Sequence, residues 1–292
     1  MKLETKDLLT GDEISSKEFL KLIDFSIKLK KQNKTGKEKP LLKNKTLAMI
    51  FEKPSTRTRV SFEVGMSQLG GHAVNLSSNQ MQHSRGESAE DTAKTLSCYV
   101  DAIVARVYEH DFIEELAKHS TIPVINGLSN SYHPCQTLAD LMTIKEHKKK
   151  FKDLKIAWIG DGNNVCNSLI FGCSKTQTEI VIATPKGFEP NSDVVKKASK
   201  YTSVDLTTDP EFAVRDADVV MTDTFVSIHD SDAKSKKFLP TFQVNESLMN
   251  KAKDNVIFMH CLPAKRDQEV TSAVIDGPQS VVWDEAENRL HT

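Results

Sequence analysis

The chain has 292 residues, of which 38% are hydrophobic and 27% are charged, and its formal net charge is −1. This length suits two domains, and the near-neutral charge gives no reason to expect a nucleic acid or an anionic membrane as partner. No apolar run is long enough to span a bilayer, and the first residues lack the apolar core of a secretory signal. The five cysteines form no Cys-x-x-Cys pair, which argues against a disulfide framework or a structural zinc site and indicates a cytoplasmic protein.

The first half of the chain alternates between helical and strand patterns. Apolar residues at helical spacing predict a helix over residues 13–31, and the apolar run 46–51 predicts a buried strand. Pro54 marks a turn, and a helix is expected to begin near Ser55. Further strands are expected at 72–76, 101–107 and 122–125, and further helices at 88–99, 112–118 and 134–147. Repeated β–α units imply a parallel sheet covered by helices on both faces.

The charged residues 148–153 interrupt this alternation, and we take them as the junction between a domain 1–149 and a domain 150–292. The polar residues 227–243 predict a loop long enough to serve as a lid or binding segment. The second domain is expected to contain strands at 155–159, 179–183, 203–206, 218–221, 256–259 and 281–283, and helices at 165–175 and 193–199. The predicted fold class is α/β, with two doubly wound parallel-sheet domains.

The expected helix start at Ser55 is a candidate anion site. Ser55, Thr56, Arg57 and Thr58 bring hydroxyls and a guanidinium to a helix N-terminus, whose free N–H groups and partial positive charge favour phosphate-like anions. Arg57 and Arg59 are two residues apart, so on a helix only one of them can face a given ligand. These residues alone fit an ordinary exposed helix cap equally well.

Polar side chains also follow the neighbouring strands, where ligands of open α/β sheets bind. Arg106 ends one expected strand, and His133, Cys135 and Gln136 begin the helix after the next one. Gln82 lies in the polar loop after the second strand. These donors suit a small anion that carries a carbonyl. Singly they fit an ion pair or a helix-start histidine, but their shared position favours a site.

The second half contains a glycine-rich loop and two reactive side chains at strand ends. The loop at Gly160 begins like a dinucleotide fingerprint, but Val165 stands where the third glycine belongs, so we expect no nucleotide cofactor. Asp223 closes a later strand and Cys261 follows another. An acid and a thiol at adjacent strand ends suit the deprotonation of an amine, although a capping carboxylate and a buried filler thiol are the simpler interpretations.

Six segments carry a family resemblance that covers nearly the whole chain. They are Phe51-Glu52-Lys53-Pro54-Ser55-Thr56-Arg57-Thr58-Arg59, Asp101-Ala102-Ile103-Val104-Ala105-Arg106, His133-Pro134-Cys135-Gln136, Gly160-Asp161-Gly162-Asn163-Asn164, His260-Cys261-Leu262-Pro263 and Glu285-Ala286-Glu287-Asn288-Arg289. In this order they resemble the aspartate/ornithine carbamoyltransferases. The His-Cys-Leu-Pro turn is similar to the ornithine branch rather than to the aspartate branch.

The resemblance implies a cytoplasmic transferase of arginine biosynthesis that moves the carbamoyl group of carbamoyl phosphate to the side-chain amine of L-ornithine. It implies an active site in the cleft between the domains and a homotrimer in which Gln82 reaches a neighbouring site. No metal is expected, because arginines and the helix end neutralise the phosphate. No cofactor, nucleic acid or membrane is expected either. The implied carbamoyl phosphate ligands are Ser55, Thr56, Arg57, Thr58, Gln82, Arg106, His133, Gln136, Cys261, Leu262 and, from the second domain, Arg289.

The resemblance also implies residues for the amine and for the chemistry. Ornithine would be held by Asn164, Asp223, Ser227 and Ile228. The implied catalytic residues are Arg106, His133, Asp223 and Cys261. An alkyl amine has a reference pKa near 10.4, so a proton acceptor or a desolvated pocket is expected beside it.

Two features depart from the family pattern. The loop that usually reads Ser-Met-Gly is Ser227-Ile228-His229 here, so another amine such as putrescine or a modified ornithine stays open as acceptor. Family members continue into a last helix that packs on the first domain, which this sequence, ending at Thr292, apparently lacks. Two further alternatives are a nucleotide-dependent oxidoreductase, suggested only by the loop at Gly160, and a catalytically silent relative, against which the intact set of site residues speaks.

Overall fold

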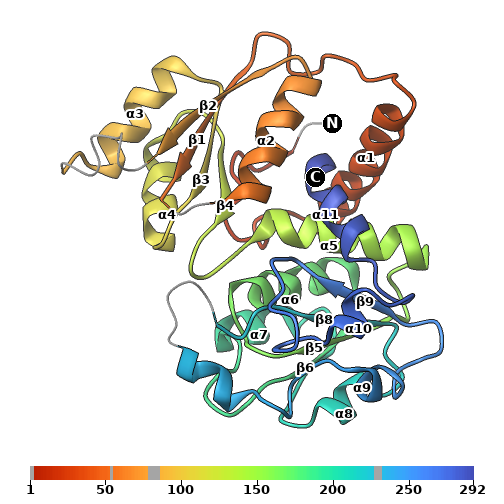
Figure 1. Ribbon diagram of the computed structural model, residues 1–292. Helices are drawn as coiled ribbons and strands as arrows, with labels where there is room; N and C mark the ends of the chain where they lie inside the picture. Colours follow the sequence, from red (N-terminus) through yellow and green to blue (C-terminus); the bar gives the residue numbers. More distant parts are fainter. Residues whose placement is uncertain (1–2, 53–54, 78–85, 227–231) are drawn as a thin grey trace. The chain divides into compact units, whose positions relative to one another are not determined.

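The computed structural model describes residues 3–52, 55–77, 86–226 and 232–292. The chain divides into two compact units, of which unit 1 contains Met1–Leu138 and Arg289–Thr292 and unit 2 contains Ala139–Asn288. Each unit is built on one parallel β-sheet with helices on both faces (Figure 1), which confirms the predicted α/β class. Among the described residues, no helix has the length and apolar character needed to cross a membrane.

Unit 1 has a four-stranded sheet in the order β2-β1-β3-β4. Side chains of β1 alternate between its faces: Ala48 and Ile50 pack in the cluster that contains Ile113 of α4, whereas Leu47 and Met49 pack with Met66 of α2. This alternation follows from the two-residue period of a strand. The elements are α1 (Ser16–Lys34), β1 (Thr46–Phe51), α2 (Thr56–Gln68), β2 (His72–Ser77), α3 (Ala89–Tyr99), β3 (Ala102–Arg106), α4 (His110–His119), β4 (Val124–Leu128) and the start of α5 (Pro134–Lys148).

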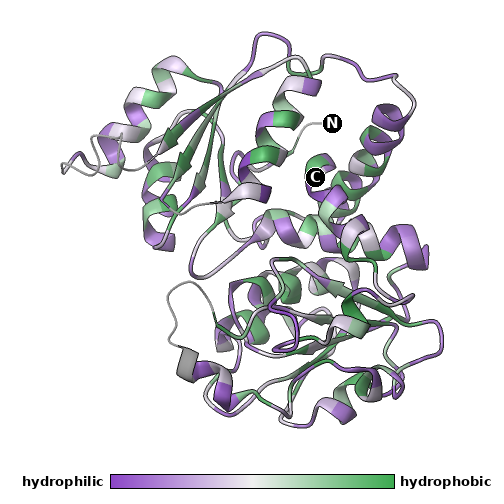
Figure 2. Ribbon diagram, in the orientation of Figure 1, coloured by the Kyte–Doolittle hydropathy of each residue, from purple (hydrophilic) through white to green (hydrophobic). Residues whose placement is uncertain are grey.

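Unit 2 has a five-stranded sheet in the order β7-β6-β5-β8-β9, whose strands are predominantly hydrophobic in Figure 2. One face packs against a cluster that includes Phe225, Phe238 and Phe242. The elements are β5 (Lys155–Ile159), α6 (Asn164–Thr176), β6 (Glu179–Ala183), α7 (Ser192–Ala198), β7 (Val204–Thr207), α8 (Pro210–Val214), β8 (Val219–Thr222), η3 (Asp232–Lys237), α9 (Glu246–Met249), β9 (Ile257–His260), α10 (Ser272–Ile275) and α11 (Val282–His291), whose last three residues group with unit 1.

The strand predicted at 281–283 is wrong, because these residues enter helix α11. Val281 donates one backbone hydrogen bond to Phe258 of β9, and Asp284 and Glu285 then follow in the first helical turn, where acidic side chains are stabilised by the helix dipole. The loop predicted at 227–243 is regular in part, since η3 lies within it and Phe238 is fully buried. Residues 227–231 lie outside the described part of the chain.

Both sheets have a point at which the strand order reverses. In unit 1 it lies between β1 and β3, and in unit 2 it lies between β5 and β8. At such a point the loops that follow the two strands leave toward opposite faces of the sheet, which opens a crevice at the carboxyl ends. The candidate site residues of each unit cluster at these ends.

Candidate functional site

The start of α2 is the first candidate binding element in unit 1. Ser55 is the N-cap residue, and its side chain makes no capping hydrogen bond. Thr56 and Arg57 are exposed in the first turn, and Arg59 forms an ion pair of 3.0 Å with Glu63 one turn further on. Arg59 is thus engaged with its own helix, whereas Arg57 lies at the helix end that favours anions.

Arg106 joins this helix start to the end of β3. Its Nη1 donates a hydrogen bond of 3.0 Å to the hydroxyl of Thr58, a side chain that is only 3% exposed. Arg106 pairs in register with Phe51, the last residue of β1, so both strands deliver their following residues to the same edge. The structure therefore brings Thr58 and Arg106 together across 48 residues of sequence.

Arg289 and the buried His133 lie in the same region of unit 1, since the charges of Arg289 and Arg106 both act on the His133 ring. His133 and Gln136 are buried at the start of α5, and Nη1 of Arg289 donates 3.0 Å to the carbonyl of Cys135. Within the residues that the structure describes, Nη2 of Arg289 is buried without a hydrogen-bond partner. A buried guanidinium N–H with no partner is costly, and an anionic or carbonyl ligand would satisfy it.

The positive charge of this region affects the pKa of His133. Burial, the Arg289 charge and the Arg106 charge, in that order, hold the pKa of His133 well below its usual value. The ring is therefore neutral near pH 7, and a neutral imidazole can donate one hydrogen bond to a carbonyl oxygen. Arg289 groups with unit 1, whereas the sequence suggested that it would come from the second domain.

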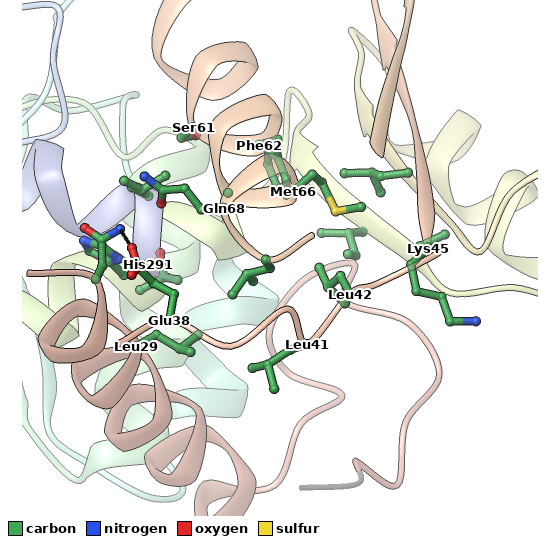
Figure 3. A pocket seen from close by; sticks show the side chains of 18 of the residues that line it. Leu29, Glu38, Leu41, Leu42, Lys45, Ser61, Phe62, Met66, Gln68 and His291 are labelled. Atoms are coloured by element: carbon green, nitrogen blue, oxygen red, sulfur yellow. Dashed lines mark hydrogen bonds between the residues drawn. The ribbon is translucent and has the colours of Figure 1, made fainter. Parts of the chain in front are cut away.

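Unit 1 also contains a cavity of about 520 Å³ (Figure 3). It is bordered by α1, β1, α2 and the end of α11, and apolar side chains such as Leu41, Leu42, Phe62 and Met66 line it. Among the described candidates, Arg289 alone borders this cavity. An apolar lining makes burial of a phosphate costly, so we do not assign the anion to it.

The candidate site of unit 2 is centred on Asp223, which directly follows β8 and is 8% exposed. Its Oδ1 accepts hydrogen bonds from the backbone N–H of Thr224 at 2.7 Å and from the thiol of Cys261 at 3.2 Å. Its Oδ2 accepts 2.8 Å from Nδ2 of Asn163. Strands β8 and β9 pair Thr222 with His260, which places the next residue of each strand side by side.

Cys261 is a hydrogen-bond donor in this arrangement. Burial and the nearby carboxylates of Asp223, Glu285 and Asp140 raise the pKa of its thiol well above the usual value. The sulfur therefore stays protonated near neutral pH and cannot serve as the base. Asp223 is the hydrogen-bond acceptor of the pair.

Buried carboxyl groups behind Cys261 hold the turn that follows β9. Glu285 accepts the backbone N–H of His260 at 2.9 Å, and burial beside the Asp140 carboxyl raises the pKa of Glu285 well above its usual value. The ring of His260 accepts the N–H of Leu262 at 2.9 Å through Nδ1 and lies 3.2 Å from Glu269 through Nε2. These contacts link consecutive residues of the turn to the core.

One group of described residues has the composition of a metal site. Ligand atoms of Asp223, His260 and Cys261 lie within 4.8 Å of one another. Both ring nitrogens of His260 already have protein partners, at Leu262 and Glu269, and the thiol is protonated. The residues present therefore do not fit a metal ion, since ligation needs a free imidazole nitrogen and a thiolate.

The glycine-rich loop after β5 serves chain packing. A Cβ atom on Gly162 would lie 2.2 Å from the backbone nitrogen of Pro190, and the N–H of Gly162 donates to Phe188. Asn164, which was predicted to bind ornithine, is the first residue of α6 and is half-buried. Its neighbour Asn163, which sequence reasoning passed over, makes the contact to Asp223. The signal was an asparagine immediately before a helix, the usual N-cap position.

Three predicted site residues, Gln82, Ser227 and Ile228, lie outside the described part of the chain. Of the remainder, eight belong to unit 1, namely Ser55, Thr56, Arg57, Thr58, Arg106, His133, Gln136 and Arg289. Asn164, Asp223, Cys261 and Leu262 belong to unit 2.

Two parallel-sheet units, one with cationic residues at its strand ends and the other with a carboxylate there, suit a group transferase with two substrates. The family model for the carbamoyl-P binding domain of aspartate/ornithine carbamoyltransferase matches residues 6–146, and the model for the Asp/Orn binding domain matches residues 152–292. The chain belongs to the aspartate/ornithine carbamoyltransferase family.

Individual relatives agree with this family. The chain is 59% identical to an ornithine carbamoyltransferase of Cenarchaeum symbiosum, over 100% of this chain and 97% of the relative. It is 52% identical to one of Methanocaldococcus jannaschii, over 97% of this chain and 95% of the relative. The structure of ornithine carbamoyltransferase from Pyrococcus furiosus superposes with a TM-score of 0.95 at 50% identity, and the match covers 100% of this chain and 96% of that chain.

Proposed function

We propose that the protein transfers the carbamoyl group of carbamoyl phosphate to the side-chain amine of L-ornithine, producing L-citrulline and phosphate. The observation that carries the proposal is the 3.2 Å hydrogen bond from Cys261 to Asp223 at the carboxyl ends of β8 and β9. This hydrogen bond holds a carboxylate that is suited to accept a proton from an amine. Relatives that are 50–59% identical to this chain are named ornithine carbamoyltransferase.

The carbamoyl phosphate half is assigned to the cationic region of unit 1. The N-terminus of α2 and the guanidinium of Arg57 bind the phosphate, and Arg106 bridges from there to the carbonyl. The buried Nη2 of Arg289 supports this assignment, because it requires a ligand acceptor. The full proposed set is Ser55, Thr56, Arg57, Thr58, Gln82, Arg106, His133, Gln136, Cys261, Leu262 and Arg289.

The amine half is assigned to unit 2. Asp223 accepts the proton of the side-chain amine, and the protonated thiol of Cys261 fixes one oxygen of that carboxylate. Asn164 is proposed to bind the amino-acid end of ornithine, with Ser227 and Ile228. The support is the position of Asn164 and Asp223 at the carboxyl ends of β5 and β8, beside the reversal of strand order.

The reaction then proceeds by addition and elimination. The amine gives up a proton toward Asp223, and its lone pair attacks the carbamoyl carbon to form a C–N bond. Negative charge develops on the carbonyl oxygen, where Arg106, neutral His133 and the hydroxyl of Thr58 are preorganised donors. Loss of one such donor typically costs roughly 10²–10³ in rate. The C–O bond breaks, and phosphate leaves with the electron pair and takes up the second proton of the attacking nitrogen, which leaves the ureido group neutral.

The finer assignments belong to the same proposal. We propose residues 1–149 as the carbamoyl phosphate domain and 150–292 as the ornithine domain, which is supported by family-model matches to 6–146 and 152–292. We also propose a cytoplasmic homotrimer that acts in arginine biosynthesis, with Gln82 of one subunit reaching a neighbouring site. The arginines and the helix end provide the positive charge that a phosphate needs, so the proposed reaction requires no metal or cofactor.

The test is a carbamoylation assay with L-ornithine, putrescine, lysine and aspartate, followed by titration with a bisubstrate mimic that joins a phosphonate to ornithine. We expect ornithine to give the highest kcat/KM and the mimic to bind more tightly than either half alone. Preference for another amine would overturn the acceptor assignment. A mimic that binds no better than a simple phosphonate would overturn the amine half.

A further inference from the structure

The side chain of Asn163 makes hydrogen bonds with both ends of its amide group. Oδ1 accepts from the backbone N–H groups of Val165 at 3.0 Å and Cys166 at 3.1 Å, which caps helix α6. Nδ2 donates 2.8 Å to Oδ2 of Asp223, a residue 60 positions away. One side chain thus connects the first turn of α6 with the carboxylate that we assign to the amine.

The two backbone donors settle which way this amide faces. If the amide were turned over, its NH₂ group would meet the N–H groups of Val165 and Cys166, and its oxygen would meet the carboxylate. The N-cap contacts therefore force the NH₂ group toward Asp223. The N-terminus of α6 therefore fixes the amide of Asn163, and this amide in turn orients the carboxylate of Asp223.

The donors are divided unequally between the two oxygens of Asp223. Oδ1 receives the N–H of Thr224 and the thiol of Cys261, whereas the described residues give Oδ2 one donor, Asn163. An ionised carboxyl group has about four acceptor positions, two on each oxygen. The remaining capacity lies on Oδ2, beside the amide of Asn163.

We propose that Asn163 is a positioning residue for amine activation, which holds Asp223 in the rotamer that presents Oδ2 to the attacking amine. The inference rests on the proposed function of Asp223 and extends it to a residue that does not contact the reacting atoms. A simple N-cap role would require only the Oδ1 contacts, so the two roles can be separated by substitution.

Asn163→Asp separates them, because aspartate caps helices about as well as asparagine, whereas an ionised aspartate cannot donate a hydrogen bond to a carboxylate. The matched control is Asn191→Asp, since Asn191 caps α7 through hydrogen bonds from Asp193 and Val194. We expect the control to keep kcat/KM for ornithine within about twofold of wild type. For Asn163→Asp we expect a roughly 10²-fold loss at neutral pH, the typical cost of a small misplacement of a reacting group.

The pH dependence gives a signature that a capping defect would not produce. Two facing carboxylates share a proton, which raises the pKa of Asp223 in the variant and reduces its capacity as acceptor. We expect the ratio of variant to wild-type kcat/KM to rise between pH 7 and pH 9. The other titratable groups near Asp223 are Cys166, Cys261 and Glu285, whose pKa values are raised, and His260, which has a ring nitrogen within 4.8 Å of the carboxylate. All four are common to both proteins.

A double variant, Asn163→Asp with Asp223→Asn, keeps the experiment decisive if the single variant folds poorly. It restores a donor–acceptor pair with the roles exchanged, so the melting temperature should recover while activity stays at the level of Asp223→Asn alone. The proposal is overturned if Asn163→Asp behaves like Asn191→Asp, if its loss is independent of pH, or if the double variant exceeds Asp223→Asn in activity. Retention of activity by Asp223→Asn itself would instead overturn the proposed function of Asp223.

Discussion

The two units place their candidate sites at equivalent positions of their sheets but give them opposite electrostatic character. In unit 1, Arg106 at the end of β3, the N-terminus of α2 after β1 and Arg289 of α11 form a cationic region. In unit 2, residues after β5, β8 and β9 surround a carboxylate. The position is therefore a property of the parallel sheet, whereas the chemistry is a property of the residues that end each strand.

The opposite character also explains two pKa shifts that lead to the same result. Burial and positive neighbours lower the pKa of His133, and burial and negative neighbours raise the pKa of Cys261. Each group is thereby kept neutral and able to donate a hydrogen bond near pH 7. The charge in each unit is left on the residues that we propose to meet the substrates, namely the arginines in unit 1 and Asp223 in unit 2.

Removal of the unit 2 carboxylate should have the largest effect. An alkyl amine with a reference pKa near 10.4 is almost fully protonated at neutral pH, and a general base contributes roughly 10²–10⁴ in rate. We expect Asp223→Asn to lower kcat/KM for ornithine by about 10³-fold. Titration calorimetry should show unchanged affinity for carbamoyl phosphate. The control is Asp205→Asn on strand β7, and an equal loss of carbamoyl phosphate affinity would contradict the division between the units.

A smaller effect is expected from the exposed arginine at the start of α2. Loss of a charge-assisted contact to phosphate costs several kcal/mol in favourable cases, so Arg57→Ala should weaken carbamoyl phosphate binding by roughly 10²-fold. Arg59→Ala is the matched control, because Arg59 lies on the same helix and pairs with Glu63. Calorimetric titration of both variants checks the assignment. Equal losses in the two would show that the region acts through net charge alone.

The start of α2 in unit 1 could be predicted from the sequence because its parts are local. A strand, a turn and a helix start are consecutive, so the exposed position of Arg57 at the start of α2 follows from the hydrophobic pattern around it. The strands β1, β5 and β6 match their predicted bounds for the same reason. The short apolar run at 281–283 misled the prediction, because the acidic residues after it start a helix.

The unit 2 site was harder to predict because its contacts join distant segments. Asn163 and Asp223 are 60 residues apart, and Asp223 and Cys261 are 38 apart. Spacing along the chain does not reveal which of two consecutive asparagines caps the helix and which faces a ligand. The contacts of His260 with Leu262 and Glu269 likewise follow from packing, and the sequence contains no motif that predicts them.

The neutral state of His133 should be visible in the pH dependence of stability. Because its folded pKa lies below the unfolded value near 6.5, the unfolded chain binds a proton that the folded chain does not, so stability falls as pH drops below about 6.5. The contribution has a limiting slope of about 1.4 kcal/mol per pH unit. In His133→Asn the free energy of unfolding, measured with urea from pH 7.5 to pH 5, should fall less steeply. The exposed His72→Asn is the control, and an unchanged slope in His133→Asn would contradict a neutral imidazole.

The smallest effect concerns thiol reactivity and tests the influence of Asp223 on Cys261 directly. A thiolate is the species that alkylating reagents attack, so the raised pKa of Cys261 should make it react slowly with iodoacetamide at pH 8, while the exposed Cys98 reacts readily. Asp223→Asn removes a negative neighbour and replaces the anionic acceptor of the thiol hydrogen bond with a neutral amide oxygen, which lowers the pKa of Cys261 without opening the site. Peptide mass spectrometry over time should therefore show faster labelling of Cys261 in the variant, by roughly 3- to 10-fold for a pKa change of half a unit to one unit. Cys98 provides an internal control, because its rate should be the same in both proteins. Equal labelling of Cys261 in the two proteins would mean that burial alone sets its reactivity and that the Asp223 carboxylate does not raise the pKa of the thiol.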